Sequence, residues 1–153
     1  MDERMKEIAE IAKEFQLDVE YEDGVLLKSR ENGSTMEVSK NVFYIGDKKE
    51  GPFSEYIVRF ATQHRHFRDW EDAAAYIRML LTDERLPIEF YGDGRFGGDI
   101  ARDDYFNLSA ALLSERFPYH AEELSHFSFE IHSWSGQYDV KRMRVTELPL
   151  RKG

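Results

Sequence analysis

The stretch Val25-Leu-Leu-Lys-Ser-Arg-Glu-Asn-Gly-Ser-Thr-Met-Glu-Val38 has the pattern of two β-strands joined by a tight turn. At its centre, Asn32-Gly33 suits a two-residue turn, because both residues tolerate a positive φ angle. With that turn, Lys28 would lie opposite Glu37, and the two side chains carry opposite charges. The register also gathers apolar side chains on one face, which we expect to be buried: Val25, Leu27, Met36 and Val38.

The sequence on either side of this hairpin continues the pattern. Apolar residues recur every three to four positions over residues 3–15 and predict an amphipathic helix. Asp23-Gly24 is a second hairpin signal, just ahead of the first strand. We expect the sheet to continue with a strand over residues 42–45, a loop over 46–52 and a longer strand over 53–66.

The second half of the chain also predicts a mixture of helices and strands. A helix is predicted from Trp70, with Asp69 as its N-cap. A short strand over residues 88–91 and a helix over residues 104–115 follow. The chain then closes with a hairpin whose turn is Ser135-Gly136 and in which Ile131 faces Val140.

Together these elements predict an α+β fold. We expect a largely meandering antiparallel sheet of about six to eight strands, with about three α-helices packed on it. The 153 residues suit one domain of ordinary size, so the prediction is a single globular domain over residues 1–153.

Composition narrows the classes of function. The chain has 30 acidic and 21 basic residues, a formal net charge of -9, and no cysteine. Disulfide and thiolate chemistry are therefore excluded, and a reducing, cytoplasmic location is expected. An acidic surface repels a phosphate backbone, and no apolar run approaches the length of a bilayer span. We expect a soluble protein without nucleic-acid or membrane partners.

The segment Gly92-Asp-Gly-Arg-Phe-Gly97 matches the spacing of a dinucleotide-binding loop, but no helix opens directly after it, as that fold requires. We interpret it as part of a glycine-rich loop over residues 92–98. Backbone N–H groups and a forked guanidinium there could hold a weakly anionic or zwitterionic ligand. The candidate ligand-binding residues are Gly92, Gly94, Arg95, Gly97 and Asp99, but the interpretation we favour is a flexible tip that binds nothing.

His64 and His66 form a second candidate site. Residues two apart on a strand share a face, so both imidazoles could contact one divalent ion. No third ligand is fixed by sequence spacing, and the two histidines could equally cap an apolar strip at the solvent boundary. We therefore expect no metal and no cofactor, and keep this pair as the weaker alternative.

The leading functional hypothesis is a non-enzymatic cytoplasmic protein-interaction or regulatory module. Its acidic, aromatic-rich surface would engage a basic or mixed-charge protein partner. The alternative is a small enzyme, such as a metal-dependent hydrolase using His64 and His66, or a protein with a small-anion site at the 92–98 loop. No catalytic residues are assigned, and the sequence does not indicate the oligomeric state.

Overall fold

The computed structural model describes residues 3–21 and 24–150 and has the α+β class predicted from the sequence. The chain forms two compact units, Met1–Leu81 and Thr82–Gly153, and each has its own antiparallel sheet. The prediction that residues 1–153 act as a single domain stays a prediction. No helix in the described part of the chain is long and apolar enough to cross a membrane.

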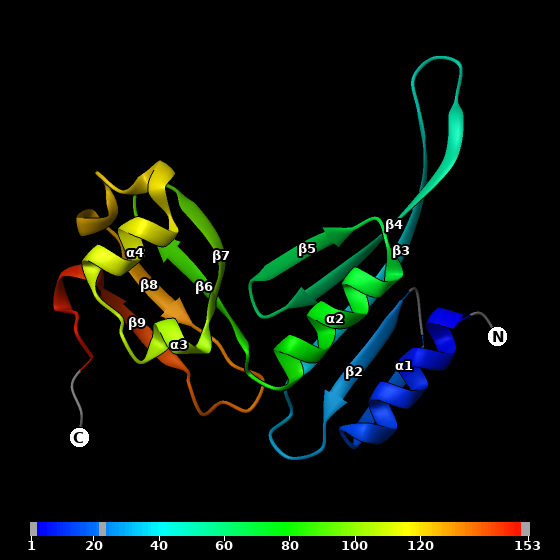
Figure 1. The fold of residues 1–153 in the computed structure, drawn as a ribbon, viewed down its shortest axis with the longest axis horizontal. Coiled ribbons are helices and arrows are strands. Elements are labelled where there is room, and N and C mark those ends of the chain that lie inside the picture. The colour runs from blue at the N-terminus through cyan, green and yellow to red at the C-terminus, as the bar shows by residue number, and fades with distance from the viewer. Residues whose placement is uncertain (1–2, 22–23, 151–153) are drawn as a thin grey trace. The chain divides into compact units, whose positions relative to one another are not determined.

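The first unit contains two helices and a five-stranded sheet of order β1-β2-β3-β4-β5, with α1 and α2 lying in front of it in Figure 1. The predicted core face is confirmed: Val25, Leu27, Met36 and Val38 are all buried. The bounds are α1 Glu3–Glu14, β1 Leu17–Tyr21, β2 Val25–Ser29, β3 Thr35–Ile45, β4 Glu50–Phe60, β5 Gln63–Phe67 and α2 Trp70–Leu81.

The predicted register between β2 and β3 is wrong by two residues. Lys28 lies opposite Thr35, not Glu37. The turn is longer than expected because the hydroxyl of Ser29 accepts the backbone N–H of Glu31 at 3.2 Å, and the side chain of Asn32 accepts that of Ser34 at 2.9 Å. A shift of two residues leaves every side chain on its original face, so the buried set is unchanged.

The other predicted turn and strands of this unit need similar corrections. Asp23 lies outside the described residues, and Tyr21 pairs with Val25, whereas a two-residue turn at Asp23-Gly24 would place Tyr21 opposite Leu26. The predicted strand over residues 53–66 is two strands, because the chain reverses after Phe60, where Ala61 has a φ of 54°. The predicted loop over 46–52 is shorter, since β4 begins at Glu50 and pairs with an extended β3.

The second unit has a four-stranded sheet of order β7-β6-β8-β9. The predicted pairing of Ile131 with Val140 is confirmed. Its core is apolar and aromatic, with Phe90 and Phe129 fully buried at the centre. The bounds are β6 Arg85–Tyr91, β7 Arg95–Ala101, α3 Arg102–Tyr105, α4 Ala110–Arg116, the 3-10 helices η1 Pro118–His120 and η2 Leu124–His126, β8 Ser128–Ile131, β9 Val140–Arg144 and η3 Val145–Glu147.

The glycine-rich segment over residues 92–98 is not a loop, which corrects the sequence interpretation. Only residues 92–94 form a turn, and from Arg95 onward the chain is strand β7, paired with β6. Glycine is accommodated in this strand because a neighbouring side chain fills the space. A Cβ atom at Gly98 would lie 3.0 Å from the ring of Phe117.

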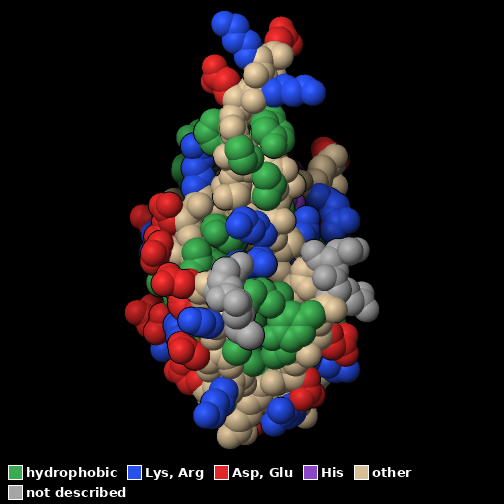
Figure 2. Space-filling view, turned by 90° about the vertical axis from the view of Figure 1, so that its right-hand side faces the viewer, with side chains coloured by type: hydrophobic (Ala, Val, Ile, Leu, Met, Phe, Trp, Pro, Cys, Tyr) green, Lys and Arg blue, Asp and Glu red, His purple; other side chains and the backbone are tan. Residues whose placement is uncertain are grey.

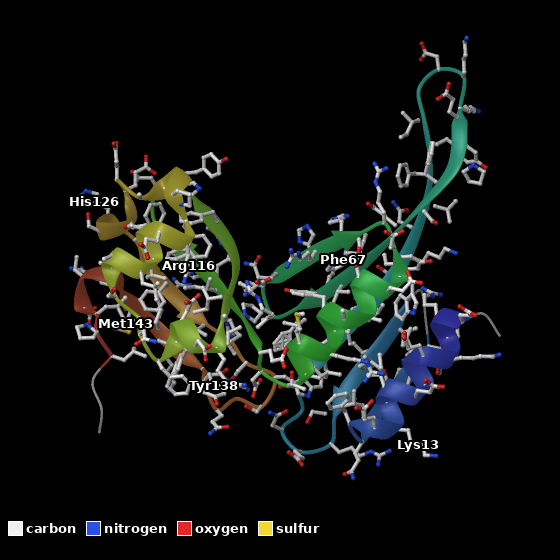
Figure 3. The ribbon with its side chains drawn as sticks, viewed as in Figure 1. Lys13, Phe67, Arg116, His126, Tyr138 and Met143 are labelled. Atoms are coloured by element: carbon white, nitrogen blue, oxygen red, sulfur yellow. The ribbon has the colours of Figure 1, made fainter. Side chains whose placement is uncertain are left out.

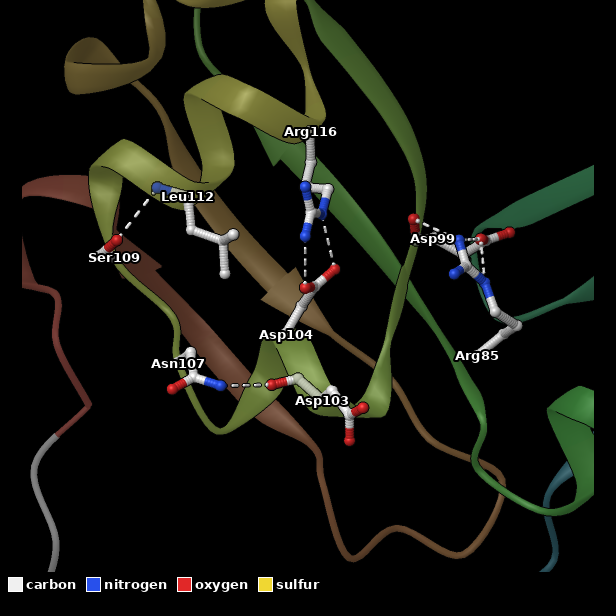
Figure 4. A network of polar contacts seen from close by, with 8 residues as sticks. All are labelled: Arg85, Asp99, Asp103, Asp104, Asn107, Ser109, Leu112 and Arg116. Carbon is white, nitrogen blue, oxygen red and sulfur yellow. Dashed lines mark hydrogen bonds and ion pairs between the residues drawn. The ribbon is translucent and has the colours of Figure 1, made fainter.

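The helix predicted over residues 104–115 is broken into α3 and α4. The break occurs because the hydroxyl of Ser109 accepts the backbone N–H of Leu112 at 3.0 Å and starts a new helix. Arg116 then reaches back to Asp104 with two hydrogen bonds of 3.0 Å each (Figure 4). This pair joins α3 to α4 where a continuous helix was expected.

Candidate functional site

The second unit contains an open pocket of about 430 Å³ beside the turn between β6 and β7. Three of the predicted ligand-binding residues, Gly92, Gly94 and Arg95, line it. The opposite side comes from the segment of η1 and η2, on which His126 is labelled in Figure 3. The remaining lining residues are Asp93, Phe96, His120, Glu123, His126 and Phe127.

Stacked rings form the apolar wall of this pocket. Phe96 lies between Phe90, at a centroid distance of 4.6 Å, and the imidazole of His120, at 3.7 Å. The ring planes are nearly parallel in both pairs, and Phe127 meets Phe96 edge to face at 5.3 Å. These contacts fix the position of the His120 ring against the wall.

The two turn glycines differ in their surroundings. A Cβ atom at Gly92 would lie 2.5 Å from the ring of Phe127, closer than real Cβ atoms approach a neighbour. A Cβ atom at Gly94 would meet no atom within 4 Å. Gly92 therefore allows the turn to approach the aromatic wall, whereas Gly94 borders open space.

Arg95, the cation predicted for this site, already forms an ion pair with Glu89. The Nε atom of Arg95 donates to Glu89 at 3.2 Å, and its guanidinium carbon lies 4.9 Å from the centre of the Tyr91 ring. The other two predicted residues, Gly97 and Asp99, lie further along β7 and do not line the pocket. Asp99 accepts from the Nε atom of Arg85 at 2.7 Å (Figure 4).

The pocket has an excess of negative charge. The carboxylates of Asp93 and Glu123 are exposed, and neither makes a side-chain hydrogen bond or ion pair with the described part of the chain. Glu89 balances Arg95 in the ion pair just described. Apart from the two imidazoles, the carboxylates of Asp93 and Glu123 are therefore the charges of the lining that no partner in it balances.

His64 and His66 lie on β5 and are exposed, with ring centroids 5.3 Å apart. The Nδ1 atom of His66 is 3.2 Å from Glu55, and hydrogen bonds from His66 and Asn41 lower the pKa of Glu55. Over residues 3–21 and 24–150, no group of three or more histidine, aspartate or glutamate side chains is placed to hold a metal ion. Among these residues, the pair thus lacks the third ligand that a zinc site requires.

A further feature of the first unit is the outer part of the β3–β4 hairpin, residues 39–55, which we call the arm. β2 pairs with β3 only as far as Val38, and β5 pairs with β4 only from Tyr56 onward. The arm therefore extends past both neighbouring strands (Figure 1), and its outer backbone edges have no strand neighbour among the described residues.

The arm exposes apolar side chains, with exposed fractions of 55% for Val42, 59% for Tyr44, 50% for Ile45 and 40% for Phe53. Phe43 and Phe53 pack against each other across the strands at a centroid distance of 5.9 Å. In Figure 2 the charged tip stands at the top of the view, with green hydrophobic side chains gathered below it. Val42 pairs with Ser54 and Phe43 with Phe53, so exposed apolar side chains lie on both faces of the hairpin. A projecting hairpin that is apolar on both faces is a candidate interaction surface.

Sequence reasoning missed the arm and half of the pocket. The uninterrupted apolar run Val42-Phe-Tyr-Ile45 could have signalled the arm, because a strand with one exposed face normally alternates. The spacing of His120, Glu123 and His126, three residues apart, could have signalled a polar cluster. No protein-family model, curated protein sequence or solved structure matches this chain.

Proposed function

We propose that this protein is a non-enzymatic, cytoplasmic interaction or regulatory module that binds a protein partner through the arm. The observation that carries the proposal is the exposure of Val42, Tyr44, Ile45 and Phe53 on a hairpin that projects past its sheet. Contiguous apolar side chains that stay exposed on a folded protein mark interaction sites, so the arm is the surface that we expect a partner to cover. The absence of cysteine supports the reducing compartment.

The arm is preorganised for binding. The Phe43–Phe53 pair and the hydrogen bond from Asn41 to Glu55 at 3.4 Å link its two strands. A partner would therefore meet a hairpin that is already ordered, and less conformational entropy would be lost on association. The free backbone edges offer further N–H and C=O groups for pairing.

Charge indicates the kind of partner. The arm contains three basic and three acidic residues, so the net charge of -9 belongs to the rest of the chain. We infer that the partner has an apolar groove for the arm and basic residues around that groove. The acidic surface of this protein outside the arm would attract those basic residues and so speed association. A second copy of this chain would carry the same negative charge and be repelled.

Site-specific photo-crosslinking tests this proposal. Benzoylphenylalanine replaces Tyr44 on the arm or, as the control, Tyr119, which is 96% exposed in the second unit. The expected result is a discrete adduct with another protein from Tyr44 that is absent from Tyr119, and purified wild-type chain should compete it away. Adducts common to both positions, adducts with a second copy only, or no adduct at all would overturn the proposal.

A further inference from the structure

We propose that the pocket beside the β6–β7 turn binds a small organic molecule that carries a protonated amine. The inference is independent of the function proposed for the arm, because all lining residues belong to the second unit. It rests on the volume of the pocket, its aromatic wall and the sign of its free charges.

The size of the pocket suits a metabolite-sized ligand. Its volume of about 430 Å³ lies within the range of small-molecule sites. The stacked rings of Phe96 and His120 and the ring of Phe127 supply an apolar surface for the body of a ligand. Because the wall is already packed, a ligand would find it in place and would not have to order it.

The charges favour a cation over an anion. Asp93 lies on the β6–β7 turn and Glu123 between η1 and η2, so free carboxylates border the pocket from two sides. A phosphate or carboxylate ligand would be repelled by both. The one guanidinium in the lining, that of Arg95, is held by Glu89.

Hydrogen bonding narrows the class to an amine with N–H donors. Ionised carboxylates only accept hydrogen bonds, so Asp93 and Glu123 favour a ligand that donates them. A primary ammonium group can donate up to three hydrogen bonds to this set, and bonds between charged partners are the strong ones. A quaternary ammonium has the charge but no donor, so it should bind more weakly.

Four related probes separate charge from hydrogen bonding. Phenethylamine, 2-phenylethanol, phenylacetate and benzyltrimethylammonium share an aromatic body and differ in the group that would face the carboxylates. Binding to the full chain is followed by NMR, using the imidazole signals of His120 and His126. We expect phenethylamine to bind, and the alcohol and the carboxylate to bind at least about tenfold more weakly.

Variants locate the site. Glu123→Gln should weaken phenethylamine binding by about tenfold, because it removes one charged acceptor. The control is Glu122→Gln, since Glu122 is exposed, adjacent in sequence and outside the lining. Its affinity should match that of the wild type, and the melting temperature of both variants should be unchanged.

Several results would overturn the proposal. They are the absence of phenethylamine binding, equal or tighter binding of phenylacetate or 2-phenylethanol, and equal losses in Glu122→Gln and Glu123→Gln. Stronger binding of benzyltrimethylammonium than of phenethylamine would also contradict it, because the carboxylates would then not act as hydrogen-bond acceptors. None of these outcomes bears on the arm.

Discussion

Gly92 has no room for a side chain beside the aromatic wall of the pocket. The Gly92→Ala substitution would force a methyl group to 2.5 Å from the buried ring of Phe127. We expect a loss of about 1–3 kcal/mol in the free energy of unfolding, measured by urea denaturation. Gly94→Ala is the matched control, since its Cβ meets no atom within 4 Å, and should stay within about 0.5 kcal/mol of the wild type. Equal losses would show that the close approach to Phe127 is not the cause.

The pair formed by Asp104 and Arg116 predicts a pH-dependent stability. The hydrogen bond from Arg116 lowers the pKa of Asp104 below its ordinary value of 3.8. Asp104 therefore binds a proton more readily in the unfolded chain, so the pair stabilises the fold above about pH 3.8. That contribution is lost as the pH falls through the lower pKa of the folded protein.

Thermal unfolding of Arg116→Gln checks this dependence. The variant should melt below the wild type at neutral pH, and the gap should close in acid below the ordinary pKa of an aspartate. Lys141→Gln controls for the loss of an exposed positive charge and should show no such closing gap. If the gap for Arg116→Gln were the same at neutral and acidic pH, the pair would not be the source of the stability.

Among the elements, α4 depends on its N-cap. The hydroxyl of Ser109 accepts the backbone N–H of Leu112, and its loss should leave that donor without a partner. Ser109→Ala should therefore cost about 0.5–2 kcal/mol, whereas Ser109→Asp keeps an acceptor and should cost less. Chemical denaturation measures both, and identical losses would contradict the capping role.

Element type and buried face could be predicted from the sequence where the signal was local. The alternation of Phe129 and Ile131 set the inward face of β8. The pairing of Ile131 with Val140 was predicted correctly, but the predicted two-residue turn at Ser135-Gly136 is wrong, because residues 132–139 form a longer loop between the strands. Turn length was harder to predict, because the side chains of Ser29 and Asn32 accept backbone hydrogen bonds that lengthen one turn without any change in the apolar pattern. The reversal at Ala61 carries no glycine or asparagine signal at all.

The candidate site could be predicted only in part for a related reason. Gly92 and Arg95 stood out because glycine-rich segments have a recognisable composition. His120 and Glu123 lie 25 to 31 residues further along the chain, and only the packing of η1 and η2 brings them to the same pocket. The pairing of Arg95 with Glu89 likewise depends on strand register, which determines which side chains can meet across β6 and β7.

At the scale of the whole molecule, folding should not depend on a metal ion. Each unit has its own apolar core, and His66 lies beside Glu55. The melting temperature of the protein as purified should therefore stay the same when EDTA is added, as followed by calorimetry. A fall of several degrees that added zinc reverses would instead favour the metal-dependent alternative at His64 and His66.

Binding by the arm is the central claim, and one affinity comparison tests it most directly. The partner identified by crosslinking at Tyr44 is titrated against the wild type, the double variant Val42→Ser/Tyr44→Ser and the control Tyr119→Ser. Exposed side chains are changed in each case, so all three proteins should fold alike. We expect the double variant to bind at least about tenfold more weakly and the control to match the wild type. Equal affinity of the double variant and the wild type, or equal losses in both variants, would contradict the account.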